Sequence, residues 1–285
     1  MLLSVENGNW PADHASLRAA FTGLKDVQLR QKWETESGVY LAESRSVIER
    51  AVQAGHEPLA FLLAPRWLDQ LADVLTATGG DRTGGNLPVF LVPEDETELI
   101  TGFRVHRGAL ALFRRPPSPE VDRFLAEATG PIAILEGLVD HTNVGAIFRS
   151  AAALGIDRVL VTPTCADPLY RRSVRVSMGA VFQVPWARLP AWPDLDLLHR
   201  HGYEAWALTP NAPAESLDEV QPGGKIALLL GSEGPGLTAS TLNQADRRVA
   251  IPLDHEVDSL NVATAAAIAF WEVRRLSRPA APQSR

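Results

Sequence analysis

The sequence is poor in cysteine. Among its 285 residues it has a single thiol, that of Cys165. One cysteine excludes an intramolecular disulfide and any metal site built from several cysteines, and it suits a reducing compartment. We therefore expect a buried Cys165, no metal site and a cytoplasmic protein.

Long hydrophobic runs are also missing. No stretch approaches the roughly 18 consecutive apolar residues of a membrane helix, and residues 1–10 contain no basic segment followed by an apolar run. We expect neither a signal peptide nor a membrane partner. Hydrophobic residues make up 46% and charged residues 21% of the chain, which is typical of a folded globular protein. The length favours two domains.

Lysine is scarce as well. Lys25, Lys32 and Lys225 are the lysines, and every other cationic side chain except histidine is an arginine, whose planar fork suits phosphate. The formal net charge of -7 argues against binding nucleic acid by bulk charge. Residues 1–129 carry 18 acidic and 13 basic groups, whereas residues 130–285 carry 16 and 14. Binding of a nucleic acid would therefore depend on local arginine patches, and no DNA partner is expected.

A proline-rich seam divides the chain into two blocks. The run RRPPSPE and the later Gly130-Pro131 are turn and linker signals. We predict an N-terminal domain over residues 1–115, a linker over 116–130, a second domain over 131–277 and a disordered tail over 278–285.

Both blocks alternate short apolar runs with helical patterns, which indicates α/β layers. In the first block we predict a helical segment up to residue 36, then strands at 38–42, 59–63, 87–92 and 109–113 and helices at 44–54, 65–76 and 95–102. An amphipathic stretch follows at 121–128. In the second block we predict strands at 132–138, 158–162, 181–186, 204–209, 226–231 and 248–251 and helices at 144–154, 168–179, 195–201, 238–243 and 260–275.

The strands of the second block are continuous apolar runs such as IALLLG. Runs of this kind indicate a parallel sheet that is covered on both faces. Ligands of such sheets bind at the carboxyl ends of the strands. Three loops that follow strands are therefore the candidate functional segments.

The first loop, residues 140–157, carries Asn143, Gly145 and Arg149 at the start of a helix. Asn143 is a candidate N-cap of that helix, because its side chain can accept a backbone N–H bond. Taken alone, the segment is better explained as a helix cap followed by a solvated arginine.

The second loop, residues 228–238, places Gly231, Gly234 and Gly236 around Glu233. Three glycines allow a close approach of backbone to ligand, although a tight structural turn explains them too. No Gly-Lys-Ser/Thr follows, so the loop is not a P-loop. Glu233 would repel a phosphate, which favours a cationic or hydroxyl-bearing ligand.

The third loop lies within residues 251–272, where Ser259-Leu260-Asn261 open an alanine-rich helix. Ser259 is a candidate N-cap, and the small residues of the helix can pack closely against another element or subunit. Alone, this segment is a capped helix. All three loops follow strands of one predicted sheet, so their polar groups should meet at one edge.

In this order the three segments resemble the motifs of a known family. The patterns NxGxxxR (Asn143, Gly145, Arg149), GSEGxG (Gly231 to Gly236) and IPL...VDSLNVATA (Ile251 to Ala265) resemble the SpoU (TrmH) branch of the SPOUT RNA 2'-O-ribose methyltransferases. Residues 171–185 resemble the Arg-x-Ser-Met-Gly segment of that family, and residues 20–112 more weakly resemble its small α/β substrate-binding domain.

The resemblance implies a fold, a cofactor and an assembly. It implies a C-terminal parallel-sheet α/β domain with a deep trefoil knot, a smaller N-terminal α/β substrate-binding domain, and a homodimer whose active site draws on both subunits. S-adenosyl-L-methionine would bind in the knot and rRNA or tRNA would be methylated. By motif position, the cofactor-binding residues would be Leu208, Thr209, Leu230, Gly231, Gly236, Ile251, Leu253 and Leu260.

The resemblance also implies the catalytic set, namely Arg149, Asn143, Glu233, Ser259 and Asn261. Arg149 would activate the ribose hydroxyl. Because a guanidinium is hardly ever deprotonated, Arg149 acting as a clamp on the target phosphate is an equally good interpretation. Asn143, Ser259 and Asn261 would orient ribose, phosphate and Arg149.

Two residues depart from the family pattern. Ser232 stands where the family often has asparagine, and His255 where it usually has glycine. These departures motivate an alternative function, a non-catalytic RNA-binding protein that retains the fold. The candidate phosphate contacts are Arg104, His106, Arg107, Arg114, Arg115, Arg171, Arg172 and Arg175. Trp33 and Tyr40 are candidates for base stacking or for the core.

Overall fold

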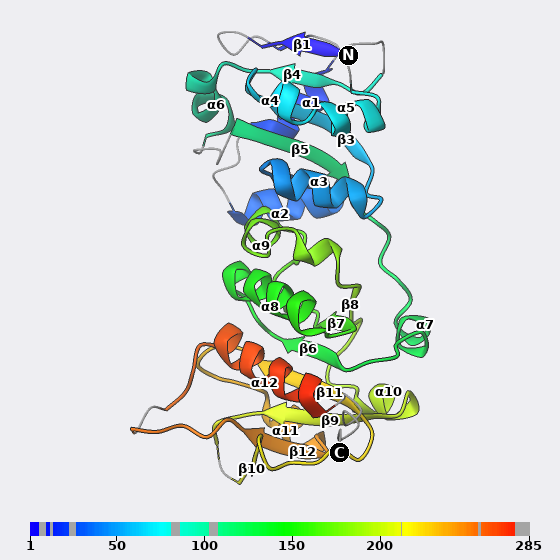
Figure 1. Ribbon diagram of the computed structural model, residues 1–285, viewed down its shortest axis with the longest axis vertical. Coiled ribbons are helices and arrows are strands. Elements are labelled where there is room, and N and C mark those ends of the chain that lie inside the picture. The colour runs from blue at the N-terminus through cyan, green and yellow to red at the C-terminus, as the bar shows by residue number, and fades with distance from the viewer. Residues whose placement is uncertain are drawn as a thin grey trace, which may run out of the picture. The chain divides into compact units, whose positions relative to one another are not determined.

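The computed structural model contains two compact α/β units, each described here by itself (Figure 1). The first unit is made of Met1–Pro117 and Leu169–Phe182, and the second of Ser118–Pro168 and Gln183–Arg285. The structure describes residues 1–5, 10–11, 14–22, 27–80, 86–102, 108–211, 213–255 and 258–276. The predicted disordered tail, 278–285, lies outside these residues.

The first unit is built on a mixed five-stranded sheet. Its central strands are almost wholly apolar and buried, in agreement with the apolar runs from which they were predicted. Strands β1, β4 and β3 run parallel, and β5 runs antiparallel to both β3 and β2. The order across the sheet is β1 (Leu2–Ser4), β4 (Val89–Leu91), β3 (Pro58–Leu63), β5 (Ala109–Arg114) and β2 (Val39–Glu43). The edge strand β1 was missed, because three residues are too short for an alternation pattern.

Helices of the first unit cover this sheet and bury an apolar core that includes Phe21, Leu62 and Phe90. The predicted helix over 65–76 is divided in two at Leu71, whose backbone leaves helical geometry. The helices are α1 (Ala15–Phe21), α2 (Val27–Glu36), α3 (Arg45–Gln53), α4 (Trp67–Gln70), α5 (Ala72–Thr78) and α6 (Glu94–Thr101).

A segment from later in the chain belongs to the first unit. It contains α9 (Arg171–Val176) and the 3-10 turn η3 (Ala180–Phe182). The ring of Phe182 lies 5.7 Å from that of Tyr40 and 4.9 Å from that of His56. The predicted strand at 181–186 is therefore wrong, because this apolar run packs against side chains of the first unit.

The second unit contains a seven-stranded sheet in which every pairing is parallel, as predicted. The short edge strand β10 was not predicted. The order across the sheet is β10 (Glu215–Ser216), β12 (Arg247–Ala250), β9 (Tyr203–Leu208), β11 (Lys225–Gly231), β6 (Ile132–Glu136), β7 (Arg158–Val161) and β8 (Trp186–Arg188).

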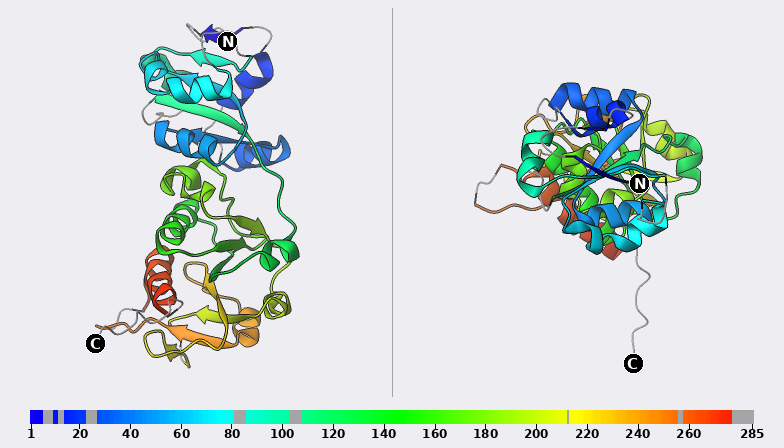
Figure 2. Two further views of the ribbon diagram at one scale, coloured as in Figure 1. Left: turned by 45° about the vertical axis from the view of Figure 1, so that its right-hand side comes forward. Right: turned by 90° about the horizontal axis from the view of Figure 1, so that it is seen from above.

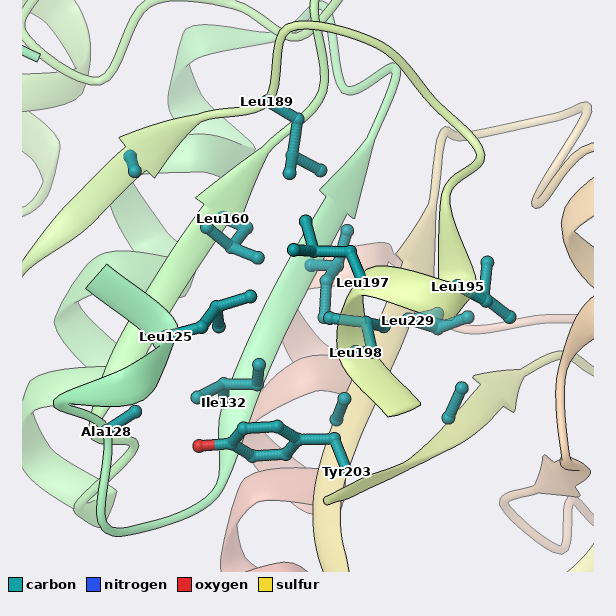
Figure 3. Packing of buried hydrophobic residues seen from close by; sticks show 14 of the residues in the cluster. Leu125, Ala128, Ile132, Leu160, Leu189, Leu195, Leu197, Leu198, Tyr203 and Leu229 are labelled. Carbon is teal, nitrogen blue, oxygen red and sulfur yellow. The ribbon is translucent and has the colours of Figure 1, made fainter. Parts of the chain in front are cut away.

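Helices cover both faces of this sheet, which explains why its strands are apolar throughout. The helices are α7 (Val121–Ala126), α8 (His141–Leu154), α10 (Leu195–Arg200), α11 (Ala239–Gln244) and α12 (Val262–Leu276). Figure 2 shows α8 and α12 on one side of the sheet, with α7 and α10 on the other. On the latter side Leu125, Leu160, Leu198 and Leu229 pack together (Figure 3).

Two further expectations concern the whole chain. Cys165 is only 5% exposed, as predicted, and its burial raises the pKa of the thiol to about 12. This thiol is therefore a poor nucleophile. Among the residues that the structure describes, no helix is long and apolar enough to cross a membrane.

Candidate active site

A pocket of about 310 Å³ opens in the second unit where β9, β11 and β12 end. These strands are neighbours in the order β12-β9-β11 and run parallel, so their three following loops meet at one edge. The structure brings together in this pocket every residue that the sequence suggested for the cofactor, namely Leu208, Thr209, Leu230, Gly231, Gly236, Ile251, Leu253 and Leu260.

Three of the suggested catalytic residues, Glu233, Ser259 and Asn261, also line the pocket. The pocket is also lined by Pro210, Ser232, Gly234, Val262 and Ala265, of which Val262 and Ala265 had no predicted contact with the cofactor. Ser232 and Gly234 lie inside the glycine motif, and Val262 and Ala265 lie on the first turn of α12. The signal that could have found them was their position beside predicted residues.

The glycine loop is closed by its own backbone. The Gly236 N–H donates to the Ser232 carbonyl oxygen at 3.0 Å, and Gly236 has a φ of +72°. A Cβ on Gly231 would overlap the Gly236 carbonyl carbon and the Leu237 nitrogen, and would lie 2.7 Å from the Gly236 oxygen. Only glycine fits at position 231 without moving the loop, so this backbone forms the wall of the pocket.

An amide and carboxylate network joins all three motifs. The Asn261 Nδ2 donates to Asn143 Oδ1 at 3.0 Å and to Glu233 Oε1 at 2.6 Å. The Asn261 Oδ1 accepts from the backbone N–H groups of Ala263 and Thr264, at 3.0 and 3.2 Å. Asn261 thus caps α12 and holds both Asn143 and Glu233.

Two predicted helix caps are therefore wrong. Asn261, not Ser259, caps α12, because its oxygen reaches the free N–H groups of the first turn. Asn143 does not cap α8 either, since that helix begins earlier and the Asp140 side chain accepts from Thr142 N at 2.8 Å. Asn143 lies within α8, where it is 7% exposed and bonded to Asn261.

Arg149 is not part of the hydrogen-bond network of Asn143, Glu233 and Asn261. It lies on α8, six residues beyond Asn143 and thus about 9 Å further along the helix axis. Its side chain is exposed, does not line the pocket, and has no hydrogen-bond or ion-pair partner among the described residues. The guanidinium is free to contact a large ligand bound outside the pocket.

The charge of the pocket limits what it can bind. Among the described residues that line it, Glu233 is the only charged side chain. A phosphate would meet a carboxylate and no cation, so the pocket suits a neutral or cationic ligand. Within the described ranges no group of three histidine, cysteine, aspartate or glutamate side chains is placed to hold a metal ion.

His255, which stands where the family usually has glycine, has a φ of +59°. This is the left-handed region that glycine adopts freely and other residues rarely adopt. The cost for a residue with a Cβ is about 1–2 kcal/mol. The backbone conformation therefore matches the glycine of the family pattern although the side chain does not.

The suggested RNA-contacting residues have varied surroundings. Arg171 and Arg175 lie 3.7 and 3.9 Å from the buried carboxylate of Glu43, and Arg114 pairs with Glu57 at 2.7 Å. Tyr40 is fully buried and Trp33 is partly buried, with Arg30 4.4 Å from the ring centre of Trp33. Arg104, His106 and Arg107 lie outside the described residues.

Comparison with known proteins agrees with this fold. The model of the SpoU rRNA Methylase family matches residues 131–271. An uncharacterized tRNA/rRNA methyltransferase of Mycobacterium tuberculosis is 42% identical over 259 residues, which are 90% of this chain and 87% of the relative. The chain thus has the fold of an RNA methyltransferase. It belongs to the SpoU rRNA methylase family.

Solved structures show the same architecture. The AdoMet-bound rRNA methyltransferase from Sinorhizobium meliloti has a TM-score of 0.79 and 23% identity, covering 98% of this chain and 99% of that one. A second structure, described as an RNA 2'-O ribose methyltransferase, has a TM-score of 0.71 and 27% identity, covering 97% and 99%.

Proposed function

We propose that this protein transfers a methyl group from S-adenosyl-L-methionine to a ribose 2'-hydroxyl of rRNA or tRNA in the cytoplasm. The observation that carries the proposal is the pocket in which the second and third motif loops meet, with Asn143 of the first motif bonded to Asn261 on its wall. In support, the relative from M. tuberculosis is named a tRNA/rRNA methyltransferase, and a similar structure is described as a 2'-O ribose enzyme. The S. meliloti structure contains AdoMet.

The pocket fits this cofactor in size and charge. Its volume of about 310 Å³ lies within the range of small-molecule sites. Leu208, Gly231, Ile251 and Leu260 line the pocket, and by motif position their backbone groups would bind the adenosine and amino-acid parts. Glu233, the charged side chain on the pocket wall, complements a sulfonium cation. When bound, the cofactor supplies an electrophilic methyl group.

The residues of this chain must then position the ribose hydroxyl and remove its proton. In the transfer the methyl–sulfur bond breaks, a carbon–oxygen bond forms, and the hydroxyl proton passes to a base, to water or to phosphate. Arg149 serves either as the activating base or as a clamp that binds the target phosphate and stabilises the developing alkoxide. Asn143 and Asn261, already bonded to each other, orient the groups at the pocket mouth, together with Ser259 and Glu233.

The proposal extends to the organisation of the chain. Residues 1–115 would bind the RNA, residues 116–130 would link the domains, and residues 131–277 would form the knotted methyltransferase domain. Residues 169–182, which contain α9, are part of the first unit and would support its binding of RNA.

The test is mapping of 2'-O-methylation in rRNA and tRNA from cells with and without the gene. We expect at least one ribose to lose its methyl group without the gene and to regain it when purified protein and S-adenosyl-L-methionine are added. Identical methylation maps would contradict the proposed reaction.

The alternative, a non-catalytic RNA-binding protein, was motivated by Ser232 and His255. The left-handed backbone at His255 weakens this argument, because the backbone at this position has a conformation that glycine adopts freely. Calorimetric titration decides between the two functions. Cofactor binding with product formation supports the enzyme, whereas RNA binding without cofactor binding supports the alternative.

We further propose that the protein is a homodimer that uses α12 as an interface element. Thr264, Ile268, Trp271 and Arg275 lie on one exposed stripe of this helix. Ile268 is 42% and Trp271 63% exposed. Large apolar side chains in one row are typical of an interface.

Replacement of Trp271 by glutamate is expected to convert the dimer to a monomer, because a charge would be buried without a partner. Size-exclusion chromatography with light scattering measures the change. Arg275→Ala, on the same stripe, is the control and should leave the dimer intact. A monomeric wild-type protein, or a W271E variant that stays dimeric, would rule out this interface.

A further inference from the structure

A buried carboxylate behind the pocket has no role in the proposed reaction. Glu136 is the last residue of β6 and is 5% exposed. Its Oε1 accepts from the Thr238 backbone N–H at 2.9 Å, and its Oε2 accepts from the Trp192 Nε1–H at 2.9 Å. Each carboxylate oxygen thus meets a neutral donor that points at it.

Glu136 contacts both ends of the glycine loop, one with its backbone and the other with its side chain. Its backbone is paired in register with Gly231, where the loop begins. Its side chain holds the N–H of Thr238, directly after the buried Leu237 with which the loop ends. Thr238 in turn caps α11, because its Oγ1 accepts from Thr241 N at 3.2 Å. The start of the loop is therefore fixed by strand pairing with Glu136, and its end is fixed by one hydrogen bond to the Glu136 side chain.

The second oxygen connects the loop to another segment. Trp192 follows β8 and is partly buried against the core of the second unit. Its Nε1–H is also 3.1 Å from Thr241 Oγ1. Glu136 therefore ties together the end of β6, the glycine loop with α11, and the segment after β8.

We propose that Glu136 is a positioning residue for the cofactor pocket, where it holds the glycine loop in its binding geometry through Thr238. The proposal rests on the proposed function for the identity of the ligand. The chemistry requires a carboxylate, because only this group offers an acceptor at both oxygens and no donor. A glutamine has nearly the same shape but must turn an NH₂ group toward one of two N–H donors.

The experiment compares Glu136→Gln with the wild type. We expect the KM for S-adenosyl-L-methionine and its calorimetric Kd to rise at least about tenfold, because a disordered pocket loop must be ordered again on binding. The kcat at saturating cofactor should change less than threefold, and the KM for RNA should not change. In ligand-free protein, hydrogen exchange at the Thr238 amide should accelerate at least tenfold.

A second substitution separates positioning from simple destabilisation. In the double variant Glu136→Gln/Trp192→Phe the indole donor is gone, so the glutamine can direct its oxygen to Thr238 and its NH₂ away. Cofactor affinity and Thr238 protection should then return to within about threefold of the values for Trp192→Phe alone. Trp192→Phe keeps the bond from Thr238 to the carboxylate and should bind cofactor within threefold of the wild type.

The outcomes are distinct. Unchanged cofactor affinity in E136Q, or a double variant no better than E136Q, overturns the positioning role. If E136Q does not fold, the double variant provides the test. Removing the indole can restore the protein only if the defect of E136Q is the conflict between the glutamine NH₂ group and the Trp192 N–H group. A wild-type protein that does not bind S-adenosyl-L-methionine refutes the proposed function instead, and Thr238 exchange in the same variants still tests the role of Glu136.

Discussion

Replacement of Arg149 by alanine is expected to reduce methyl transfer by at least about 100-fold, the usual loss when one preorganised transition-state donor is removed. Binding of S-adenosyl-L-methionine should stay within twofold of the wild type, because Arg149 does not line the pocket. The fold should also survive, since the side chain is exposed and has no partner among the described residues. Single-turnover kinetics and calorimetric titration measure the two effects separately.

Arg149→Lys distinguishes two forms of the phosphate clamp. A clamp that needs only positive charge would recover part of the rate, whereas a bidentate phosphate contact would not. The matched control is Arg123→Ala, a second arginine replacement at an exposed helical position, on α7. Normal turnover by the Arg149→Ala protein would remove Arg149 from the mechanism.

Replacement of Gly231 by alanine should weaken cofactor binding by roughly 5- to 150-fold, because overpacking of a closed site costs about 1–3 kcal/mol. The added Cβ overlaps backbone atoms of Gly236 and Leu237, which cannot rotate away as a side chain would. The loop must therefore open, and the pocket wall opens with it. Calorimetry with S-adenosyl-L-methionine measures the loss.

Ser232→Ala is the control for this substitution. It removes a weak bond of 3.4 Å from Ser232 Oγ to the Gly236 oxygen and adds no atom to the loop. Cofactor affinity should fall less than threefold. Equal affinities in the Gly231→Ala and wild-type proteins would show that the loop backbone does not shape the binding site.

Much of the second unit could be predicted because its strands are long and uniformly apolar. The segments 226–231 and 132–138 were predicted as buried parallel strands, and they pair as β11 and β6. The two-residue strand β10 could not be found this way, because it is too short to show a period. The run at 181–186 is apolar for another reason, since Phe182 packs on Tyr40 and His56 from the distant N-terminal block.

The residues of the candidate site could be predicted to about the same extent as the strands of the second unit. Parallel strands bring their following loops to one edge whatever the details of packing, so ordered motifs were enough to gather the pocket residues. The roles of the asparagines were not predictable. Asn143 and Asn261 are 118 residues apart and meet only because α8 and α12 pack against each other.

By itself, the sequence determined the α/β class, the parallel sheet and the second and third motif loops that line the pocket, because these follow from local hydrophobic runs and from the residue types in the loops. The tertiary structure decided which polar groups are paired. It joined Asn261 to Asn143 and Glu233 and placed Glu136 behind the glycine loop, while Arg149 was left without a partner among the described residues. Hydrogen bonds act over about 3 Å, so such partners are defined only once distant segments have packed together.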